Sequence, residues 1–409
     1  MMRHVPHRFL FPLLFPVMLP SFPSADGLND LQRLIASVPM NGTVTVPAGV
    51  YYGRLRIVRA VTIYADSGAH LIFEGSGSAI EILCDNVTIK GLTIRGSGRD
   101  IRGIDAAIIL SGTNNTIDGC FIENALFGIH LKNAWNSTIR GNKVHGIATY
   151  APEKRGDAIR ITSGGGNILS SNTAESVCDG VYFDHTTNNC AINNEISFGR
   201  YGIHLMFSTC IKLTENRLHD NTIGAMIMKS KNVELVNNVL KDNRTINGVG
   251  VCAFETAECR IYHNAILANT AGIELKKAFR IAIHDNMVAH NSIGVKLFGG
   301  VEETHIYSNR MMGNVCQIGG IGGRNMDTWS YQGRGNYWDD YRGYDLNRDG
   351  IGDAPYRINK LFSALIDKSS ILGIFFGSPL FQFLELAGNR DQIYDKYPLI
   401  ITNISREER

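Results

Sequence analysis

The chain contains little charge and almost no excess of one sign. Asp, Glu, Lys and Arg make up 19% of its 409 residues, and the formal net charge is +2. Both surplus charges come from Arg3 and Arg8, so the chain after residue 25 is close to neutral. A nucleic-acid partner requires a basic surface, because contacts to phosphate dominate the affinity. The composition therefore argues against nucleic-acid binding.

The sequence also lacks an early apolar run that could persist as a membrane span. The run Phe9–Leu19 contains prolines, follows Arg3 and Arg8, and precedes small residues at 21–25. A basic segment, a short apolar core and a small-residue site are typical of a secretory signal peptide. We expect cleavage near Ala25 and export of the mature chain.

Cysteine is present, but in no recognisable disulfide or zinc framework. Eight cysteines lie between residues 84 and 316 at irregular spacings. A chain of this length can bury enough core without disulfides, and several cysteines lie in apolar strand patterns. We expect most of them to be buried as small hydrophobic residues.

The most extensive pattern is a repeat of about 22 residues between residues 80 and 315. Each unit contains an apolar residue followed by Asn, and a glycine that begins a short alternating strand. The recurring asparagines are Asn142, Asn172, Asn194, Asn216, Asn238, Asn264, Asn286 and Asn309. This period, with short strands and Asn/Gly turns, is typical of a solenoid. It predicts an all-β parallel β-helix whose asparagines hydrogen-bond from rung to rung. The pattern does not give the handedness, but parallel crossovers in general favour a right-handed β-helix.

The ends of such a solenoid expose strand edges that must be covered. We expect an amphipathic helix over Asp26–Val38, strands over Thr43–Val46 and Leu55–Ile63, and protruding loops at Thr149–Gly156 and Lys241–Asn247. The run Ile371–Phe376 near the other end is too short to span a bilayer. The predicted organisation is a signal peptide (1–25), an N-terminal cap with the first strands (26–70), β-helix repeats (71–334), a Gly/Asp/aromatic motif (335–356), and a C-terminal helical docking segment with a final strand (357–409).

Sulfur and imidazole groups occupy outward positions of the glycine-led strands. Alternation along a strand places His204 and Met206 outside on one rung, and Met226 and Met228 outside on the next. Cys252 joins the row of Met206 and Met228 if Gly248 is the equivalent glycine of the following rung. Thioether, imidazole and thiol groups suit Cu(I). The alternative is that the methionines pack under a loop or against a partner.

Carboxylates near the rung edges raise the alternative of a polysaccharide-cleaving enzyme. Asp157, Asp179 and Asp184 lie there, but Asp179 and Asp184 would face opposite sides of a straight strand. Glycosidic cleavage needs two carboxylates that face each other across a groove. Isolated acids at turns are commonly turn residues. The sequence therefore favours a protein without enzymatic activity.

The segment Gly335–Tyr356 is dense in glycine, aromatic and acidic residues, and it follows the repeats directly. Its oxygen-bearing residues have the spacing of the first half of a calcium loop, which gives the candidate ligands Asp345, Asn347, Asp349 and Asp353. Position 12 of such a loop should be Glu, and here it is Tyr356. A structural calcium site and a loop satisfied by its own backbone both remain open.

These features together resemble the NosD family, periplasmic proteins of nitrous oxide reductase maturation. The resemblance rests on the export signal, the rungs, Arg200–Met206, Gly224–Met228 and, above all, Gly335–Tyr356. It covers nearly the whole mature chain.

The resemblance implies a periplasmic right-handed β-helix that is not an enzyme. Such proteins work with an ABC transporter (ATPase and permease), a copper chaperone lipoprotein and nitrous oxide reductase, and they meet the membrane only through the transporter. The chain would then accept and release Cu(I), with or without sulfur, for the copper–sulfur cluster of the reductase. The implied copper ligands are His204, Met206, Met226 and Met228, whereas Cys252 rests on rung alignment alone. A polysaccharide-binding or polysaccharide-cleaving β-helix remains the alternative.

Overall fold

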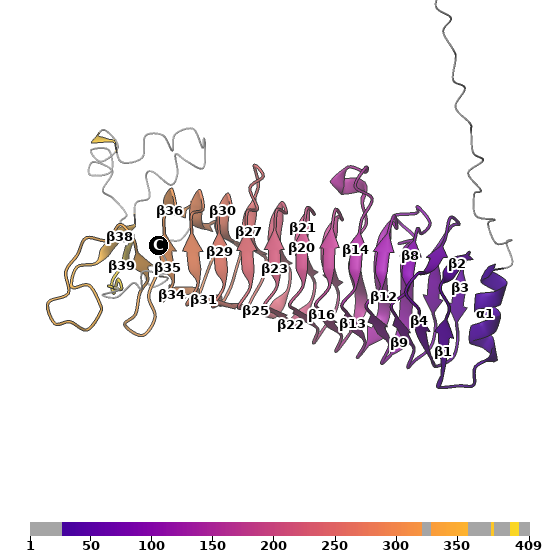
Figure 1. The fold of residues 1–409 in the computed structure, drawn as a ribbon. Helices are drawn as coiled ribbons and strands as arrows, with labels where there is room; N and C mark the ends of the chain where they lie inside the picture. Colours follow the sequence, from indigo (N-terminus) through magenta and orange to yellow (C-terminus); the bar gives the residue numbers. More distant parts are fainter. Residues whose placement is uncertain (1–26, 321–328, 359–377, 380–392, 401–409) are drawn as a thin grey trace, which may run out of the picture.

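The computed structural model describes residues 27–320, 329–358, 378–379 and 393–400. The predicted signal peptide and most of the predicted C-terminal helical segment lie outside these residues. The described chain forms one long solenoid, with helix α1 (Gly27–Ser37) at one end and the terminal loops at the other (Figure 1).

Three parallel sheets run along the solenoid, and nearly every strand pairs with the strand three places later in the chain. Sheet 1 contains β1 (Gly42–Val46), β4 (Val61–Ala65), β7 (Thr88–Lys90), β10 (Thr116–Asp118), β13 (Thr138–Arg140), β16 (Ile168–Ser170), β19 (Cys190–Ile192), β22 (Thr209–Thr214), β25 (Lys231–Val236), β28 (Arg260–Tyr262), β31 (Ala282–His284) and β34 (His305–Tyr307). Sheet 2 contains β2 (Gly49–Tyr52), β5 (Ala69–Ile72), β8 (Thr93–Arg95), β11 (Phe121–Glu123), β14 (Lys143–His145), β17 (Thr173–Glu175), β20 (Glu195–Ser197), β23 (Arg217–His219), β26 (Val239–Lys241), β29 (Ala265–Leu267), β32 (Met287–Ala289), β35 (Arg310–Met312) and β37 (Tyr337–Trp338).

Sheet 3 contains β3 (Leu55–Ile57), β6 (Ile80–Ile82), β9 (Ala106–Thr113), β12 (Phe127–Trp135), β15 (Ile159–Gly165), β18 (Asp179–Asp184), β21 (Tyr201–Met206), β24 (Ile223–Met228), β27 (Val249–Phe254), β30 (Ala271–Lys276), β33 (Ile293–Leu297) and β36 (Cys316–Gly319). A separate antiparallel pair joins β38 (Tyr356–Ile358) and β39 (Ile393–Asp395). The longest sheet has 13 strands, so the chain makes about 13 rungs. This architecture confirms the predicted all-β parallel β-helix.

The core fills the space inside the three sheets. Inward residues of each strand are aliphatic, as Ile203 and Leu205 of β21 illustrate, and both side chains are fully buried. Equivalent residues of successive rungs contact one another, so a single apolar cluster extends from Leu31 to Ile393. The period-two alternation in the sequence therefore shows which residues of a strand face the core and which face outward.

Asparagines stack inside the turns as the repeat predicts. From Asn142 to Asn336, each side-chain Nδ2 donates to Oδ1 of the asparagine in the next rung at 2.9 to 3.0 Å. Each amide also serves the backbone, since Asn216 Nδ2 donates to the Ala191 carbonyl and Asn216 Oδ1 accepts from the Asn194 amide. The ladder satisfies buried turn groups that would otherwise cost free energy.

A glycine is the second residue of most strands of sheet 3, where the next rung leaves no room for a side chain. A Cβ on Gly202 would lie 2.5 Å from the carbonyl oxygen of Gly224. The chain turns at these glycines, so the residue before each glycine shares the outer face with the second residue after it. Ile223 and Met226 accordingly belong to one outer apolar cluster.

Helix α1 covers the first rung, as predicted. Its residues Leu31 and Ile35 are buried against the core. The Gln32 side chain donates to the Arg56 carbonyl and accepts from the Arg56 amide, both at 3.0 Å, which satisfies the open edge of β3. The strand predicted over Leu55–Ile63 is instead two strands, β3 and β4, because the chain turns from sheet 3 into sheet 1 between them.

The segment Gly335–Tyr356 terminates the solenoid. Asn336 is the last member of the asparagine ladder, and its backbone amide donates to Asp395 Oδ2 at 2.6 Å. Trp338 Nε1 donates to the same oxygen at 3.0 Å, and the Tyr397 amide donates to Asp395 Oδ1 at 3.0 Å. A buried carboxylate from a distant part of the chain thus caps the ladder.

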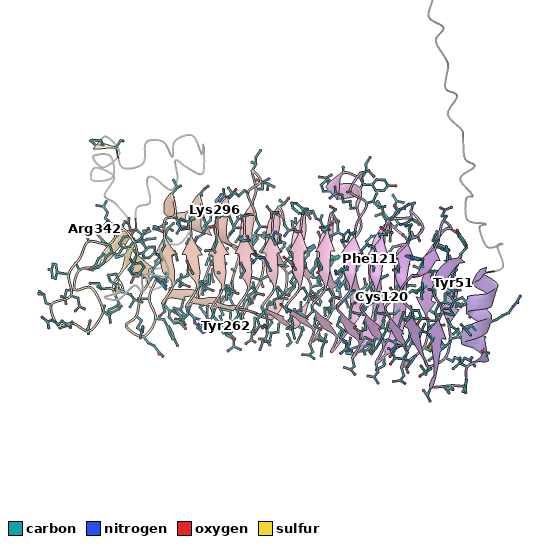
Figure 2. The ribbon with its side chains drawn as sticks, in the orientation of Figure 1. Tyr51, Cys120, Phe121, Tyr262, Lys296 and Arg342 are labelled. Atoms are coloured by element: carbon teal, nitrogen blue, oxygen red, sulfur yellow. The ribbon has the colours of Figure 1, made fainter. Side chains whose placement is uncertain are left out.

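The surface shows the two predicted loops and no paired cysteine. Figure 1 shows loops that rise from one flank before β15 and before β27, and the first contains the short 3-10 helix η1 (Pro152–Lys154). Figure 2 shows the side chains along both flanks, with Lys296 of sheet 3 and Tyr262 of sheet 1 on opposite sides.

All eight cysteines are free, and only Cys210 is exposed. Across the described ranges, no helix has the length and apolarity that a bilayer span needs.

Candidate metal centre

Five neighbouring strands of sheet 3 carry the candidate metal ligands in two outward rows. One row is Arg160, Tyr182, His204, Met226 and Cys252, and the other is Thr162, Asp184, Met206, Met228 and Phe254. Register neighbours in adjacent strands lie about 5 Å apart. His204 pairs with Met226, and Met206 pairs with Met228. The structure therefore brings the four predicted ligands together on β21 and β24.

The candidate ligands differ in exposure. The three methionines are half-buried, whereas His204 is only 6% exposed. The Tyr182 ring stacks on the imidazole at a centroid distance of 4.4 Å, and the Tyr201 ring meets it edge-on at 5.0 Å. The sequence placed His204 on an open outer face, but these aromatic rings cover it.

The predicted position of Cys252 is wrong. Gly248 closes the loop before β27, where its amide donates to the Thr245 carbonyl, and Gly250 is the equivalent glycine of the rung. Cys252 therefore follows Met226 in the row of His204, and Phe254 follows Met228. Burial raises the pKa of the Cys252 thiol to about 12, so the group is a protonated thiol at neutral pH.

His204 has one engaged and one unengaged ring nitrogen. Nδ1 lies 2.8 Å from Asp179 Oδ2, while the buried Nε2 has no hydrogen-bond partner. Arg200 donates to both oxygens of the same carboxylate, from Nε at 2.9 Å and from Nη2 at 2.8 Å. An imidazole that donates one N–H to a carboxylate and leaves the other nitrogen bare is the usual form of a metal-binding histidine.

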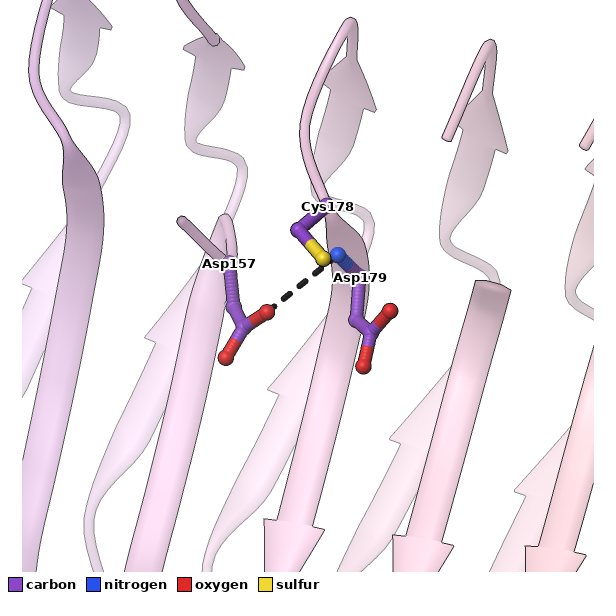
Figure 3. A group of neighbouring side chains, drawn as sticks. All are labelled: Asp157, Cys178 and Asp179. Atoms are coloured by element: carbon purple, nitrogen blue, oxygen red, sulfur yellow. Dashed lines mark hydrogen bonds between the residues drawn. The ribbon is translucent and has the colours of Figure 1, made fainter. Parts of the chain in front are cut away.

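The acids that the sequence linked to carbohydrate chemistry form a buried cluster with Cys178. The ligand atoms of Asp157, Cys178 and Asp179 lie within 4.8 Å of one another, and Figure 3 shows the Asp179 amide donating to Asp157 Oδ1. Each acid is bound by an arginine, since Arg160 donates to Asp157 at 3.0 Å and Arg200 donates to Asp179 at 2.9 Å. Burial also raises the pKa of the Cys178 thiol to about 12. The cluster is therefore an internal charge network rather than an open catalytic pair.

The two acids of this cluster have opposite pKa shifts. Burial and the charge of Asp179 raise the pKa of Asp157 to about 7. For Asp179 burial acts in the same direction, but the hydrogen bonds from His204 and Arg200 outweigh it and lower the pKa. One negative charge therefore resides on Asp179 at mildly acidic pH, next to His204.

The raised pKa of Asp157 predicts a pH-dependent stability. The folded chain binds this proton more tightly than the unfolded chain, whose pKa is the ordinary 3.8, so stability falls as pH rises from about 4 to about 7. The variant Asp157→Asn lacks the ionisation, and we expect its stability to fall less over the same range. Melting temperatures of both chains at pH 5, 6, 7 and 8 measure the difference. Parallel pH curves for the two chains would contradict the assignment.

The predicted calcium ligands form an internally hydrogen-bonded loop. Asp345 accepts from the amides of Asp349 and Gly350, Asn347 Oδ1 accepts from Asp349, and Asp353 accepts from Leu346. Asx turns of this kind satisfy a loop by its own backbone, which favours the second of the two interpretations. Calcium binding by Asp345, Asn347, Asp349 and Asp353 stays a prediction.

Sequence reasoning missed the link between Asp179, Arg200 and His204. Period-two alternation placed Asp179 and Asp184 on opposite faces, but the turn at Gly180 brings both to the outside. The signal was available in the sequence, because Asp157 and Asp179 occupy equivalent positions in successive rungs, two residues before the register partners Ile159 and Val181. Asp184 itself lies beside Arg160 and His185, and not beside His204.

The fold and this face define a parallel β-helix with an outer cluster of imidazole and thioether groups. A family model described as "Periplasmic copper-binding protein (NosD)" matches residues 145–343, which include the whole cluster. The chain is 26% identical over 328 residues to the "Probable ABC transporter binding protein NosD" of Stutzerimonas stutzeri, with 77% of this chain and 75% of the relative covered. The protein of the same name from Pseudomonas aeruginosa is 26% identical over 357 residues, with 84% and 83% covered. These matches together support membership of the chain in the NosD family.

Solved structures show the same fold in proteins with other roles. The A-module of the Azotobacter vinelandii mannuronan C-5 epimerase AlgE6 has a TM-score of 0.58 at 15% identity, covering 73% of this chain and 94% of the module. The Streptococcus pneumoniae surface adhesin PfbA has a TM-score of 0.56 at 12% identity, covering 73% of this chain and 90% of the adhesin. Likeness at this level of identity shows the β-helix fold alone.

Proposed function

We propose that the face of β21 and β24 accepts Cu(I) and passes it on during assembly of the copper–sulfur cluster of nitrous oxide reductase. The observation that carries this proposal is the unengaged, buried Nε2 of His204 on a face shared with three thioethers. An imidazole nitrogen without a hydrogen-bond partner and neutral sulfur atoms are ligands that suit Cu(I) and disfavour hard cations such as Mg²⁺ and Ca²⁺.

The ligand set suits transfer rather than permanent storage. His204, Met206, Met226 and Met228 are uncharged ligands on rigid strands, and the half-buried methionines lie nearer the surface than the imidazole. Met206 Sδ accepts a hydrogen bond from the Tyr182 hydroxyl at 3.3 Å, which orients the thioether and leaves its second lone pair available. Cys252, a protonated thiol beside Met226, is at most an additional ligand.

The comparisons support a copper-related role and an ABC transporter as a partner. The matching family is described as copper-binding and periplasmic, and both curated relatives are named as ABC transporter binding proteins. We place this chain in the periplasm as a non-enzymatic accessory of an ABC transporter ATPase and permease. A copper chaperone lipoprotein would supply the ion and nitrous oxide reductase would receive it, with sulfur as the other cargo that the same system requires.

The polysaccharide alternative finds no support at this face. Cleavage of a glycosidic bond requires two carboxylates that reach substrate. Asp157 and Asp179 are buried, and each is bound by an arginine. The likeness to an epimerase concerns the fold and not these residues.

The proposal is tested by anaerobic titration of the exported chain with Cu(I) against a chromophoric Cu(I) chelator. We expect the protein to withhold one Cu(I) per chain from the chelator, and to withhold Zn²⁺ or Ca²⁺ from their own indicators much less effectively. A chain that leaves all Cu(I) to the chelator, or that depolymerises a uronate polymer, would contradict the proposal.

A further inference from the structure

His204 of the proposed copper site is supported by a buried charge network that contains Asp179 and Arg200. Asp179 is fully buried at the start of β18, and its carboxylate reaches His204 Nδ1 across one rung at 2.8 Å. Arg200, in the turn before β21, donates two N–H groups to that carboxylate in a bidentate pair. Neither acceptor oxygen can rotate away without breaking a charge-assisted hydrogen bond.

We infer that Asp179, clamped by Arg200, is a positioning residue that holds His204 as the Nδ1–H tautomer and so presents a bare Nε2 to the metal. This inference rests on the proposed copper role of His204. A carboxylate only accepts hydrogen bonds, so the nitrogen facing it must carry the proton. In the neutral ring, Nε2 is then the atom with the free lone pair.

The neighbouring rings restrict the remaining freedom of the imidazole. Tyr182 stacks nearly parallel to it, with an angle of 12°, while Tyr201 stands across it at 80°. The register neighbour on the β24 side is Met226. Rotation of the ring about its Cβ–Cγ bond would lose both the stacking and the Asp179 hydrogen bond. The network therefore fixes orientation as well as tautomer, as partners of metal-bound histidines commonly do.

The variant Asp179→Asn inverts the tautomer with little change in shape. Arg200 has only donors, so its Nε keeps the amide oxygen of the new Asn side chain at the Oδ1 position, while its Nη2, which shares Oδ2 with His204, loses its acceptor. The amide NH₂ then turns toward His204 Nδ1, which becomes the acceptor, and the proton moves to Nε2. The proton on Nε2 now occupies the position that the metal requires. An equivalent exchange in a serine protease triad produces the wrong tautomer with the geometry intact.

The test is ¹⁵N NMR of the full exported chain labelled at histidine, in which the two ring nitrogens of each tautomer have distinct shifts. The signal of His204 is assigned by its loss in His204→Gln. We expect the Nδ1–H tautomer in the copper-free wild type, the Nε2–H tautomer in Asp179→Asn, and a Cu(I) affinity for that variant about 10- to 100-fold lower. The matched control is Asp285→Asn, because Asp285 forms an equivalent 2.8 Å contact with His284 Nδ1 next to β31 of sheet 1, away from the proposed site. It should change neither quantity.

The outcomes separate this inference from the copper role itself. An Nε2–H tautomer in the wild type would overturn the inference even if Asp179→Asn does not fold. Weaker copper binding by Asp179→Asn with an unchanged tautomer would also overturn it, because the loss would then be structural. If the wild type withholds no Cu(I) while its His204 is the Nδ1–H tautomer, the copper proposal fails and the positioning of the ring stands.

Discussion

The double variant His204→Gln/Met226→Leu is expected to lose more than about 100-fold in Cu(I) affinity, because it removes two ligands, and loss of a single outer-shell partner already costs about 10- to 100-fold. The two residues are register neighbours on β21 and β24, so they act on one ion. Leu keeps the approximate volume of Met, and Gln keeps a polar group at the imidazole position. Competition with a chromophoric Cu(I) chelator measures the loss.

Two comparisons make this result specific. The control His284→Gln/Met287→Leu changes the same residue types on sheets 1 and 2, and it should bind Cu(I) as the wild type does. Melting temperatures of all three chains exclude unfolding as the cause. Equal affinity in the double variant and the control would mean that the ion binds elsewhere on the chain.

Replacing Asp395 by Leu should destabilise the C-terminal end of the solenoid by roughly 2 to 6 kcal/mol, because two buried donors lose their acceptor at about 1 to 3 kcal/mol each. Those donors are the amide of Asn336 and the indole of Trp338, and the part-buried amide of Tyr397 loses its acceptor as well. Solenoid stability is a sum over neighbouring rungs, so the loss should appear first at the end of the stack.

Hydrogen exchange localises this effect better than a single melting temperature. We expect faster exchange of backbone amides in β35 and β37 of Asp395→Leu, with little change in the rungs around β12. The isosteric Asp395→Asn keeps one acceptor oxygen and should lie between the variant and the wild type. Unchanged protection of β35 and β37 in Asp395→Leu would show that the carboxylate does not cap the ladder.

The repeat made most of the fold predictable, because the interactions that define a rung involve only residues of that rung and its neighbours. Each rung repeats one apolar alternation and one buried asparagine, so Asn216 could be assigned without knowledge of any distant residue. The cap Asp395 could not, because it reaches Asn336 across 59 positions from a segment outside the repeat. Contacts of that kind leave no periodic signal.

The sequence predicted which outward residues of sheet 3 lie in the same row, but it did not predict the hydrogen bonds that their side chains form. The glycine period placed His204 with Met226 correctly, because those two rungs have equal length. It failed for Cys252 because the loop before β27 adds residues between Lys241 and Val249, which changes the equivalent glycine. It could not reveal the Asp179–His204 bond, which depends on how sharply the chain turns at Gly180.

The central claim is that His204 and the neighbouring thioethers bind Cu(I) together. X-ray absorption spectroscopy of the chain loaded with one equivalent of Cu(I) tests this most directly, because nitrogen and sulfur ligands scatter distinguishably. The account predicts a Cu(I) centre with one imidazole and at least two sulfur ligands, and loss of the imidazole scattering in His204→Gln. A centre with only oxygen and nitrogen ligands, or a spectrum that His204→Gln leaves unchanged, would contradict it.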